Sequence, residues 1–267
     1  MSVLPRASAY SLWKYRDFIR SSISNEYKTR FARSRFGTAW IVLQPLAMVL
    51  IYTSVLSGIL GAKLAGVNNR FGYAMYLLAG ILGWSLFSDI VQRCMVVFVD
   101  NAGLIKKMTF PKITLPAISV GSAVIANFAL LIVVVIAAVV LGFPMGPRLL
   151  LLVPLTLLTA VFAAALGIIL GTLNVFMRDI AQIIPILLQF WFWVTPIIYP
   201  LNTVPVGIRD LARLNPVTPI IEGYHSVLVY NEWPPRDLVW VFVASIVLAV
   251  FALSLYRRAS QDMVDVL

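Results

Sequence analysis

Charged residues are scarce in this chain. Only 12% of its 267 residues are Asp, Glu, Lys or Arg, whereas 61% are hydrophobic and the mean hydropathy is +0.92. A water-soluble domain of this length could not keep so much apolar surface away from water. The composition therefore excludes a soluble protein and indicates an integral membrane protein.

Residues that commonly carry catalysis or bind metals are scarce as well. Cys94 is the only cysteine, which excludes an internal disulfide, and we interpret it as a small buried apolar side chain. His225 is the only histidine, whereas a metal site needs several ligands, so we interpret it as a polar residue of a loop helix. We expect no metal and no cofactor bound by this chain.

The sequence also lacks two common motifs, one that carries a catalytic nucleophile and one that binds nucleotide phosphates. It contains no Gly-x-Ser-x-Gly nucleophile motif and no Gly-x-x-x-x-Gly-Lys-Ser/Thr phosphate loop. If the protein uses ATP, another polypeptide must bind it.

Long apolar runs are what the sequence has instead. A helix crosses the hydrocarbon core with about 20 apolar residues, and a β-barrel would show short alternating segments rather than continuous runs. We therefore predict an all-α integral membrane protein with six transmembrane helices. The six runs cover residues 38–60, 73–99, 115–142, 149–173, 180–200 and 237–256.

Basic residues predict the orientation of these spans. The segments on one side of the six runs hold 14 Lys or Arg residues, and those on the other side hold 6. Because positive loops stay in the cytoplasm, we expect both termini to be cytoplasmic in a multi-pass cytoplasmic (inner) membrane protein. The net charge of +10 is then mainly a topology signal, which argues against nucleic acid as a partner. We expect no cleaved secretory signal before the first span.

The chain divides into a cytoplasmic N-terminal segment (1–37), a membrane domain (38–260) and a short cytoplasmic tail (261–267). In the first segment, apolar residues recur at four-residue intervals at Tyr15, Ile19, Ile23, Tyr27 and Phe31. This pattern predicts an amphipathic helix that lies in the cytoplasmic interface of the membrane. The alternative is a solvated basic tail.

The loop after the second run predicts a short cytoplasmic helix. Asp100 or Asn101 can cap it, and Leu104, Ile105 and Met108 would share one face. Such a face needs the membrane or a protein partner to pack on. The alternative is an ordinary basic loop.

The outer loop, residues 201–236, predicts two short half-helices. The first covers 204–214, and the second begins with Thr218 as N-cap and Pro219 at the first helical position and ends near Tyr230. Two half-helices at an outer mouth suggest a gate or a re-entrant lid. The alternative is a stiff surface loop.

Two opposite charges lie within the second run. Asp89 and Arg93 are four residues apart and share one helix face, with the acid first, which favours an ion pair. A structural pair is the favoured interpretation, and a place along a transport route is the alternative.

The fifth run ends in QFWFWVTPIIYP, residues 189–200. Successive helical residues turn by about 100°, so these four neighbouring rings point all round the helix and cannot all line a pore. We predict a mixed aromatic collar, with Gln189 facing protein or water and Pro196 weakening the helix end beside the outer gate.

Several stretches together resemble the permease subunits of type 2 ABC exporters, which move polysaccharides such as O-antigen and teichoic acid. They occur in order along nearly the whole chain, with mild departures at Phe36, where Leu is expected, and at Thr195, where Ser is common. The stretches are YKTRFARSRFGTAW (27–40), QP (44–45), GILGWSLF (80–87), NAGLIKKMTFP (101–111), RDI (178–180), TPIIY (195–199) and NPVTPIIE (215–222).

The resemblance implies a transporter subunit rather than an enzyme. It implies two copies of this chain and two separate ATPase subunits that carry ATP and Mg²⁺, with export of a lipid-linked glycan, as in O-antigen export and lipopolysaccharide biosynthesis. Membrane lipid would be the other partner. The alternatives are a teichoic-acid, capsule or small lipid or drug exporter, a membrane-bound glycan or lipid transferase, and a membrane scaffold. The short loop 61–72 favours the glycan branch.

The resemblance and the residue types give three sets of candidate site residues. Sugar rings stack on aromatic faces, so the predicted substrate path is Tyr52, Trp84, Phe87, Gln189, Phe190, Trp191, Trp193 and Tyr199. The resemblance implies ATPase coupling through Tyr27, Lys28, Arg30, Asn101, Leu104, Ile105, Lys106 and Lys107. It implies an outer gate formed by Pro196, Asn215, Pro216, Pro219 and Glu222.

Overall fold

The structure is a computed structural model, and it describes residues 13–31, 36–55, 67, 69–107, 110–144, 146–203, 205–260 and 262–267. These residues form helices and connecting turns, without a strand among them. The α-helices are α2 (Arg16–Phe31), α3 (Trp40–Thr53), α4 (Gly72–Asp100), α5 (Ala102–Lys107), α6 (Thr114–Val140), α7 (Leu152–Phe176), α8 (Ile180–Val194), α9 (Val206–Leu214), α10 (Val217–His225), α11 (Leu238–Ala259) and α12 (Met263–Val266). The all-helical prediction is confirmed.

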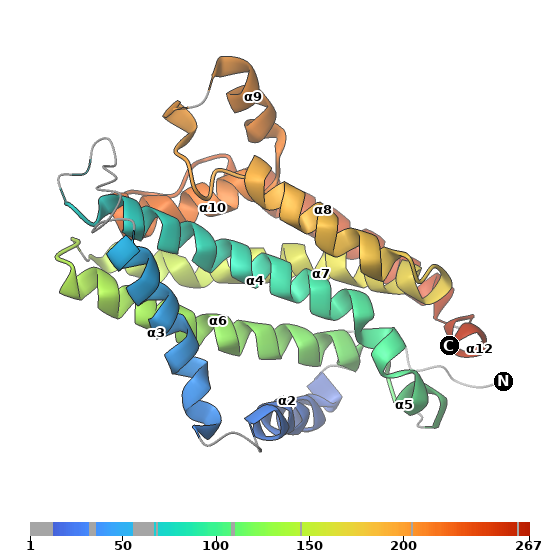
Figure 1. Cartoon of the computed structure of the whole chain (residues 1–267). Coiled ribbons are helices and arrows are strands. Elements are labelled where there is room, and N and C mark those ends of the chain that lie inside the picture. The colour runs from blue at the N-terminus through green and yellow to red at the C-terminus, as the bar shows by residue number, and fades with distance from the viewer. Residues whose placement is uncertain are drawn as a thin grey trace.

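Helix α4 lies at the centre of the bundle (Figure 1). It packs against α6, α7 and α10, and α11 covers the other side of α7. Within the most apolar 18 residues of each helix, 78% are buried in α4, against 28% in α6 and 17% in α11. The core therefore forms around α4, and the peripheral helices turn most of their apolar surface outward.

Two glycines bring α7 close to α4. Gly167 and Gly171 are four residues apart and so lie on one face of α7, the small-residue spacing that lets membrane helices approach closely. A Cβ added at Gly167 would lie 2.6 Å from the Cβ of Cys94. Cys94 itself is a buried free thiol at this contact, as its sequence context indicated.

Buried amides tie neighbouring helices to α4. Asn127 of α6 donates from Nδ2 to the Leu82 carbonyl at 2.9 Å, and Asn174 of α7 donates from Nδ2 to the Met95 carbonyl at 3.1 Å. Without water, a buried amide needs such a partner. These bonds fix the register of α6 and α7 along α4.

The outward faces of the peripheral helices are apolar. On α6 the exposed large residues recur every three or four positions, and α11 shows a similar band. They include Ile125, Phe128, Ile132, Ile136 and Val139 on α6, and Val239, Phe242, Val243, Ile246, Val247 and Val250 on α11. Such faces suit the hydrocarbon core of a bilayer, where a helix satisfies its backbone groups internally and can expose apolar side chains to lipid.

Four helical segments of the described chain are long and apolar enough to cross a membrane. They are Gly72–Asp100, Thr114–Val140, Pro147–Phe176 and Leu238–Ala259, the third including the 3₁₀ turn that precedes α7. They correspond to the second, third, fourth and sixth predicted runs. Helix α8 is a shorter apolar helix, and α3 has 14 residues, with residues 56–66 beyond it outside the described part. The count of six stays a prediction.

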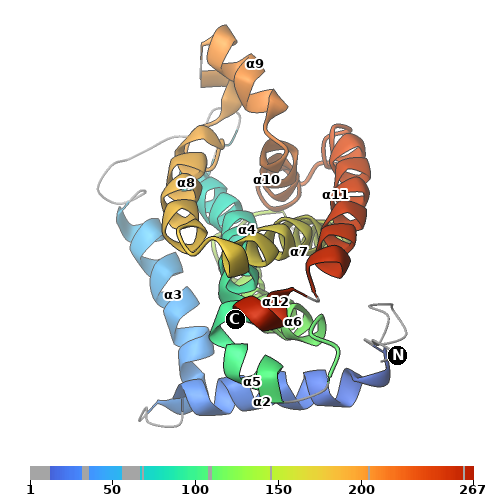
Figure 2. The ribbon, with the colours of Figure 1, turned by 90° about the vertical axis from the view of Figure 1, so that its right-hand side faces the viewer.

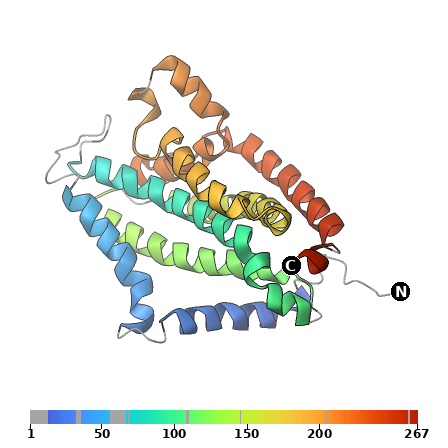
Figure 3. The same cartoon turned by 45° about the vertical axis from the view of Figure 1, so that its right-hand side comes forward.

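The remaining short helices lie at the edges of the bundle. In Figure 2, α2 runs across the base of the molecule beside α5, and Figure 3 shows it along the lower side, below α6. Helices α5 and α12 lie at one end of the bundle in Figure 1, and α9 projects from the bundle in all three views.

The outer half-helices begin at other residues than predicted. Helix α10 starts at Val217 and passes into a π-helical turn, Ser226–Tyr230, so the predicted N-cap at Thr218 is wrong. The Asn215 side chain instead accepts the Val217 N–H, at 3.0 Å. Pro219 is the third helical residue, where the missing N–H would have had no partner within the helix. The first half-helix is α9, and residue 204 lies outside the described residues.

Replacing Gly167 by Val should weaken the contact between α7 and α4. The added branched side chain would meet Cys94, and overpacking of this kind costs about 1–3 kcal/mol of unfolding free energy. We expect a lower thermal unfolding midpoint of the purified chain in detergent.

The matched control is Gly103→Ala, because a Cβ at Gly103 would meet nothing within 4 Å. Its midpoint should equal that of the wild type or rise slightly. Equal midpoints for wild type and Gly167→Val would contradict the close approach.

Candidate functional site

An ion-pair cluster joins three helices. Arg93 donates from Nε to Asp89 Oδ1 at 2.8 Å and from Nη1 to Glu26 Oε1 at 2.7 Å. Ser122 of α6 donates from Oγ to Glu26 Oε2 at 2.6 Å. The predicted pair of Asp89 and Arg93 is confirmed, and it extends into a cluster that fastens α2 to α4 and α6.

Sequence reasoning missed Glu26 and Ser122. Glu26 lies 67 residues from Arg93 and 96 residues from Ser122, so no local spacing links them. The available signal was Glu26 itself, a carboxylate within the basic N-terminal segment. The cluster supports the structural interpretation of Asp89 and Arg93, and a place along a transport route stays the alternative.

Helix α5 turns its apolar side toward the chain's own core. Ile105 is buried in a cluster with Phe98, Tyr256 and Met263, and Leu104 is half-buried against it. Gly103, Lys106 and Lys107 are exposed and do not belong to this cluster. The apolar face predicted for a membrane or a partner is thus used mainly within the chain, while the basic side is available.

Asn101 connects α4 to α5. Its carbonyl accepts the N–H groups of Leu104 and Ile105 at 3.0 Å each, and its side chain donates to the Val97 carbonyl at 2.8 Å. The side chains of Tyr27, Lys28, Arg30 and Tyr52 lie outside the described residues, as does Met108. Their predicted roles remain predictions.

The aromatic run of α8 divides between two faces. Phe190 and Trp193 are 69% and 60% exposed, and Gln189 is exposed beside them. Trp191 and Phe192 are half-buried and pack against the core around α4. The predicted division of the four rings between different faces is confirmed, because adjacent residues of one helix point in different directions. Their place along a substrate path stays a prediction.

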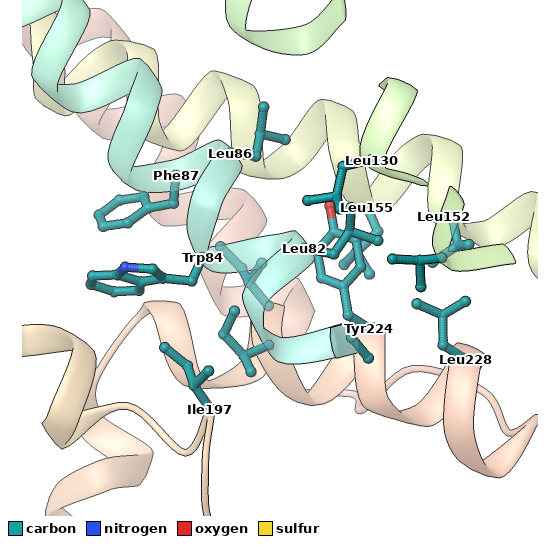
Figure 4. Close-up of a cluster of buried hydrophobic side chains, with 14 of the residues drawn as sticks. Leu82, Trp84, Leu86, Phe87, Leu130, Leu152, Leu155, Ile197, Tyr224 and Leu228 are labelled. Carbon is teal, nitrogen blue, oxygen red and sulfur yellow. The ribbon is translucent and has the colours of Figure 1, made fainter. Parts of the chain in front are cut away.

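The inward rings of α8 meet the rings of α4 edge to face. The Trp191 and Phe87 centroids are 5.3 Å apart, those of Phe192 and Trp84 are 5.7 Å apart, and Phe87 stacks on Phe162 of α7 at 5.9 Å. Figure 4 shows Trp84 and Phe87 projecting together from α4. Trp84 and Phe87 are buried, so within one copy of the chain these predicted path residues form packing contacts.

Asn215 links the end of α8 to the start of α10. It is 9% exposed, and its Oδ1 accepts Trp191 Nε1–H at 2.9 Å in addition to the Val217 N–H. Its Nδ2 lies 2.9 Å from Thr195 Oγ1, to which it donates, and Thr195 donates in turn to the Trp191 carbonyl at 2.8 Å. The Asn215 side chain thus connects the end of α8 to the start of α10, the two segments that hold the predicted outer-gate residues.

Two tyrosines of α4 bond the irregular backbone after α8. Helix α8 ends at Val194, two residues before Pro196. Beyond it, Tyr73 donates to the Ile198 carbonyl at 2.8 Å, and the Tyr76 hydroxyl lies 3.3 Å and 3.2 Å from the carbonyls of Pro196 and Tyr199. These hydroxyls satisfy carbonyls that no helix can bond.

Tyr199 folds back over the end of α8. Its hydroxyl lies 3.0 Å from the carbonyls of both Trp193 and Val194, to which it donates. Its predicted place on the substrate path therefore coincides with a capping role at the helix end.

Helix α10 is held against α4 by rings. Tyr224 is fully buried among apolar side chains (Figure 4). It contacts Gly83, where an added Cβ would lie 2.6 Å from the tyrosine ring. His225 stacks on Tyr76 with centroids 3.6 Å apart. Burial lowers the pKa of His225 to about 3, so the imidazole is neutral at pH 7. His225 is thus the last residue of a short helix of the outer loop, as predicted, and its side chain is buried.

Glu222 is the one acidic residue among the predicted gate residues. It lies on α10 and is partly buried. Burial raises the pKa of its carboxyl, and nearby Arg213 acts in the opposite direction. Pro216, which precedes α10, and Pro219 in its first turn stiffen the entry to this helix.

Comparison of the sequence with known families gives a match over most of the chain. The family model described as ABC-2 type transporter matches residues 18–229.

Curated relatives align over nearly their full length. The "O-antigen export system permease protein RfbA" of Myxococcus xanthus is 27% identical over 261 residues, 95% of this chain and 96% of the relative. A protein of the same name from Klebsiella pneumoniae is 22% identical over 259 residues, 97% and 98% of the two chains. The "Polysialic acid transport protein KpsM" of Escherichia coli is 24% identical over 240 residues, 89% and 92% of the two chains.

Glu26→Gln should loosen α2 from the bundle, because it removes the charge that Arg93 and Ser122 bind. We expect faster tryptic cleavage after Arg20, followed by mass spectrometry of the detergent-solubilised chain. Asp17→Asn is the control, because Asp17 is exposed on the same helix and its contact to Arg16 is a surface pair at 3.9 Å. Equal cleavage rates in the wild type and both variants would contradict the role of this ion-pair cluster in holding α2.

Asn215→Ala and Trp191→Phe should show coupled effects on stability, because they remove the two ends of one buried hydrogen bond. Each single change should lower the free energy of unfolding, by about 1–3 kcal/mol for Asn215→Ala. Together they should cost less than the sum, by about 0.5–3 kcal/mol, in a double-mutant cycle of chemical unfolding. Strict additivity would contradict the link between α8 and α10.

Proposed function

Since the chain belongs to the ABC-2 type transporter family, we propose that it is the membrane permease subunit of an ATP-driven exporter of a lipid-linked, O-antigen-like polysaccharide. The observation that carries the proposal is the alignment along almost the whole chain with permeases named for O-antigen export. The polysialic acid transport relative favours, as a second candidate, export of another polysaccharide by the same route.

The proposed topology has six spans in the cytoplasmic (inner) membrane. Helices α3 and α8 supply the two spans beyond the four long apolar helices, and both termini are cytoplasmic. The excess of basic residues at the α5 end of the bundle supports this orientation. Two copies of the chain then enclose the path, and the exposed rings of α8, Phe190 and Trp193, are available to the second copy or to the glycan.

The ATPase is a separate chain in this proposal, and it carries ATP and Mg²⁺. It docks at the end of the bundle where α2 and α5 lie. Ile105 positions α5 from within, and the exposed Lys106 and Lys107 are left for the partner. Because α5 follows α4 directly, a displacement of α5 by the ATPase would also displace α4 and the helices packed on it.

The proposed transport step is a rigid-body movement. Closure of the ATPase pair would tilt each permease copy about α4 and change the distance between the two outer gates. The contacts of Asn215 and Tyr224 keep α8 and α10 attached to α4 during this movement. Aromatic rings suit a sliding glycan, because they stack on the C–H faces of sugars without trapping the polymer in many hydrogen bonds.

The chain should assemble with an ATPase and export polysaccharide. Purified permease and candidate ATPase subunits are reconstituted in vesicles, and ATP hydrolysis and transfer of labelled lipid-linked polysaccharide are measured. We expect both activities only with the two subunits together. A chain that associates with no ATPase would overturn the proposal.

Reversing the charge of Lys106 and Lys107 to Glu should raise the Kd for the ATPase about tenfold and lower export in parallel, without unfolding the permease. The control is the pair Arg70→Glu and Arg236→Glu, which makes the same charge change away from α5. Unchanged assembly in the Lys106 and Lys107 variant would show that α5 does not dock the ATPase.

A further inference from the structure

A polar cavity lies beneath α9 and beside α10. Its volume is about 400 Å³, within the range of small-ligand sites. Residues from α4, α9 and α10, from the π-helical turn and from the segment before α11 line it. It is separate from the aromatic packing between α4 and α8.

The charges that line this cavity cancel. Arg209 and Arg213 come from α9, Glu222 comes from α10, and Glu232 follows the π-helical turn. Two guanidinium groups and two carboxyl groups give no formal net charge. A free anion would therefore be repelled by the carboxylates, and a free cation by the guanidinium groups. Uncharged hydroxyl groups, by contrast, find both hydrogen-bond donors and acceptors.

Ring and imidazole groups complete the lining. The Tyr230 ring is half-exposed at the cavity. His225 also lines it, is only 3% exposed, and neither of its ring nitrogens has a hydrogen-bond partner among the described residues. A buried polar atom without a partner is unusual in a folded protein. Because a Cβ added at Gly80 of α4 would lie 3.0 Å from Nε2 of His225, binding in the cavity would rest on the charged groups and the Tyr230 ring.

We infer that this cavity is a binding site for a neutral saccharide unit of the exported polymer at the outer gate. The inference rests on the proposed function and names the substrate chemistry at one place in it. Carboxylates and guanidinium groups bond sugar hydroxyls, and the Tyr230 ring stacks on an apolar sugar face. The volume fits one or two sugar residues rather than a folded chain.

The balance of charge decides against a phosphate group as the occupant. A lipid phosphate at Arg209 and Arg213 would lie beside Glu222 and Glu232, and both carboxylates would repel it. The site therefore grips the glycan and not its lipid anchor. Placed on the gate helices, it would hold the polymer between successive movements of the ATPase.

The test is saturation-transfer NMR on the full-length chain in lipid nanodiscs. The probes are a panel of neutral disaccharides and, as the anionic counterpart, glucose 1-phosphate, all at millimolar concentration. We expect transfer to at least one neutral disaccharide. Glu232→Ala and Tyr230→Leu should each weaken that binding about tenfold.

The matched control is Asp210→Ala, which removes an exposed carboxylate of α9 that does not line the cavity, and binding should stay at the wild-type level. Absence of transfer to every neutral probe, stronger binding of glucose 1-phosphate, or equal binding in Glu232→Ala and Asp210→Ala would overturn the inference.

Vesicle export separates this inference from the proposed function. A permease that exports polysaccharide with its ATPase but binds no neutral disaccharide would overturn the saccharide site alone. A permease that never joins an ATPase would overturn the proposed function, while the binding measurement would still decide whether the cavity takes a sugar.

Discussion

Helix α4 is almost enclosed by protein, and the arrangement of the other helices follows from that burial. A buried membrane helix must find partners for every polar group and close neighbours for its backbone. The glycines of α7 permit the close approach, Asn127 and Asn174 fix the register, and Tyr73 and Tyr76 bond the carbonyls freed after α8. One end of α4 leads directly into α5, the predicted ATPase coupling helix, and the other end lies beside the predicted outer gate.

Much of the fold was predictable from apolar runs, because burial in lipid requires long continuous helices. The runs at 73–99, 115–142, 149–173 and 237–256 became α4, α6, α7 and α11 within a few residues. The start of α10 was predicted two residues late, because the side chain that bonds the first turn is Asn215, two residues before Val217, and not Thr218. Both residues precede a proline in the same short stretch, and the sequence alone does not decide between them.

The candidate site was predicted unevenly, because spacing within one helix can be read from the sequence and contacts between distant segments cannot. The pair of Asp89 and Arg93 follows from helical spacing, and the division of the α8 rings follows from the 100° turn. Glu26, by contrast, reaches Arg93 only after the chain folds back, and Ile105 proved to be a core residue because α5 packs on Tyr256 and Met263. Contacts between distant segments carry no local signature. Such contacts position α2 and α5 at the predicted ATPase side and α8 and α10 at the predicted outer gate.

If α4 transmits movement from the ATPase to the gate, α5 and α10 must keep a fixed separation within one copy. Double electron–electron resonance measures the distance between spin labels at two exposed positions, Lys107 on α5 and Glu232 just beyond the π-helical turn that continues α10. Only one permease of each complex is labelled. We predict the same distance in the nucleotide-free and ATP-trapped complexes. A shift larger than the width of the distance distribution would show that the gate moves relative to α4 and would contradict the account.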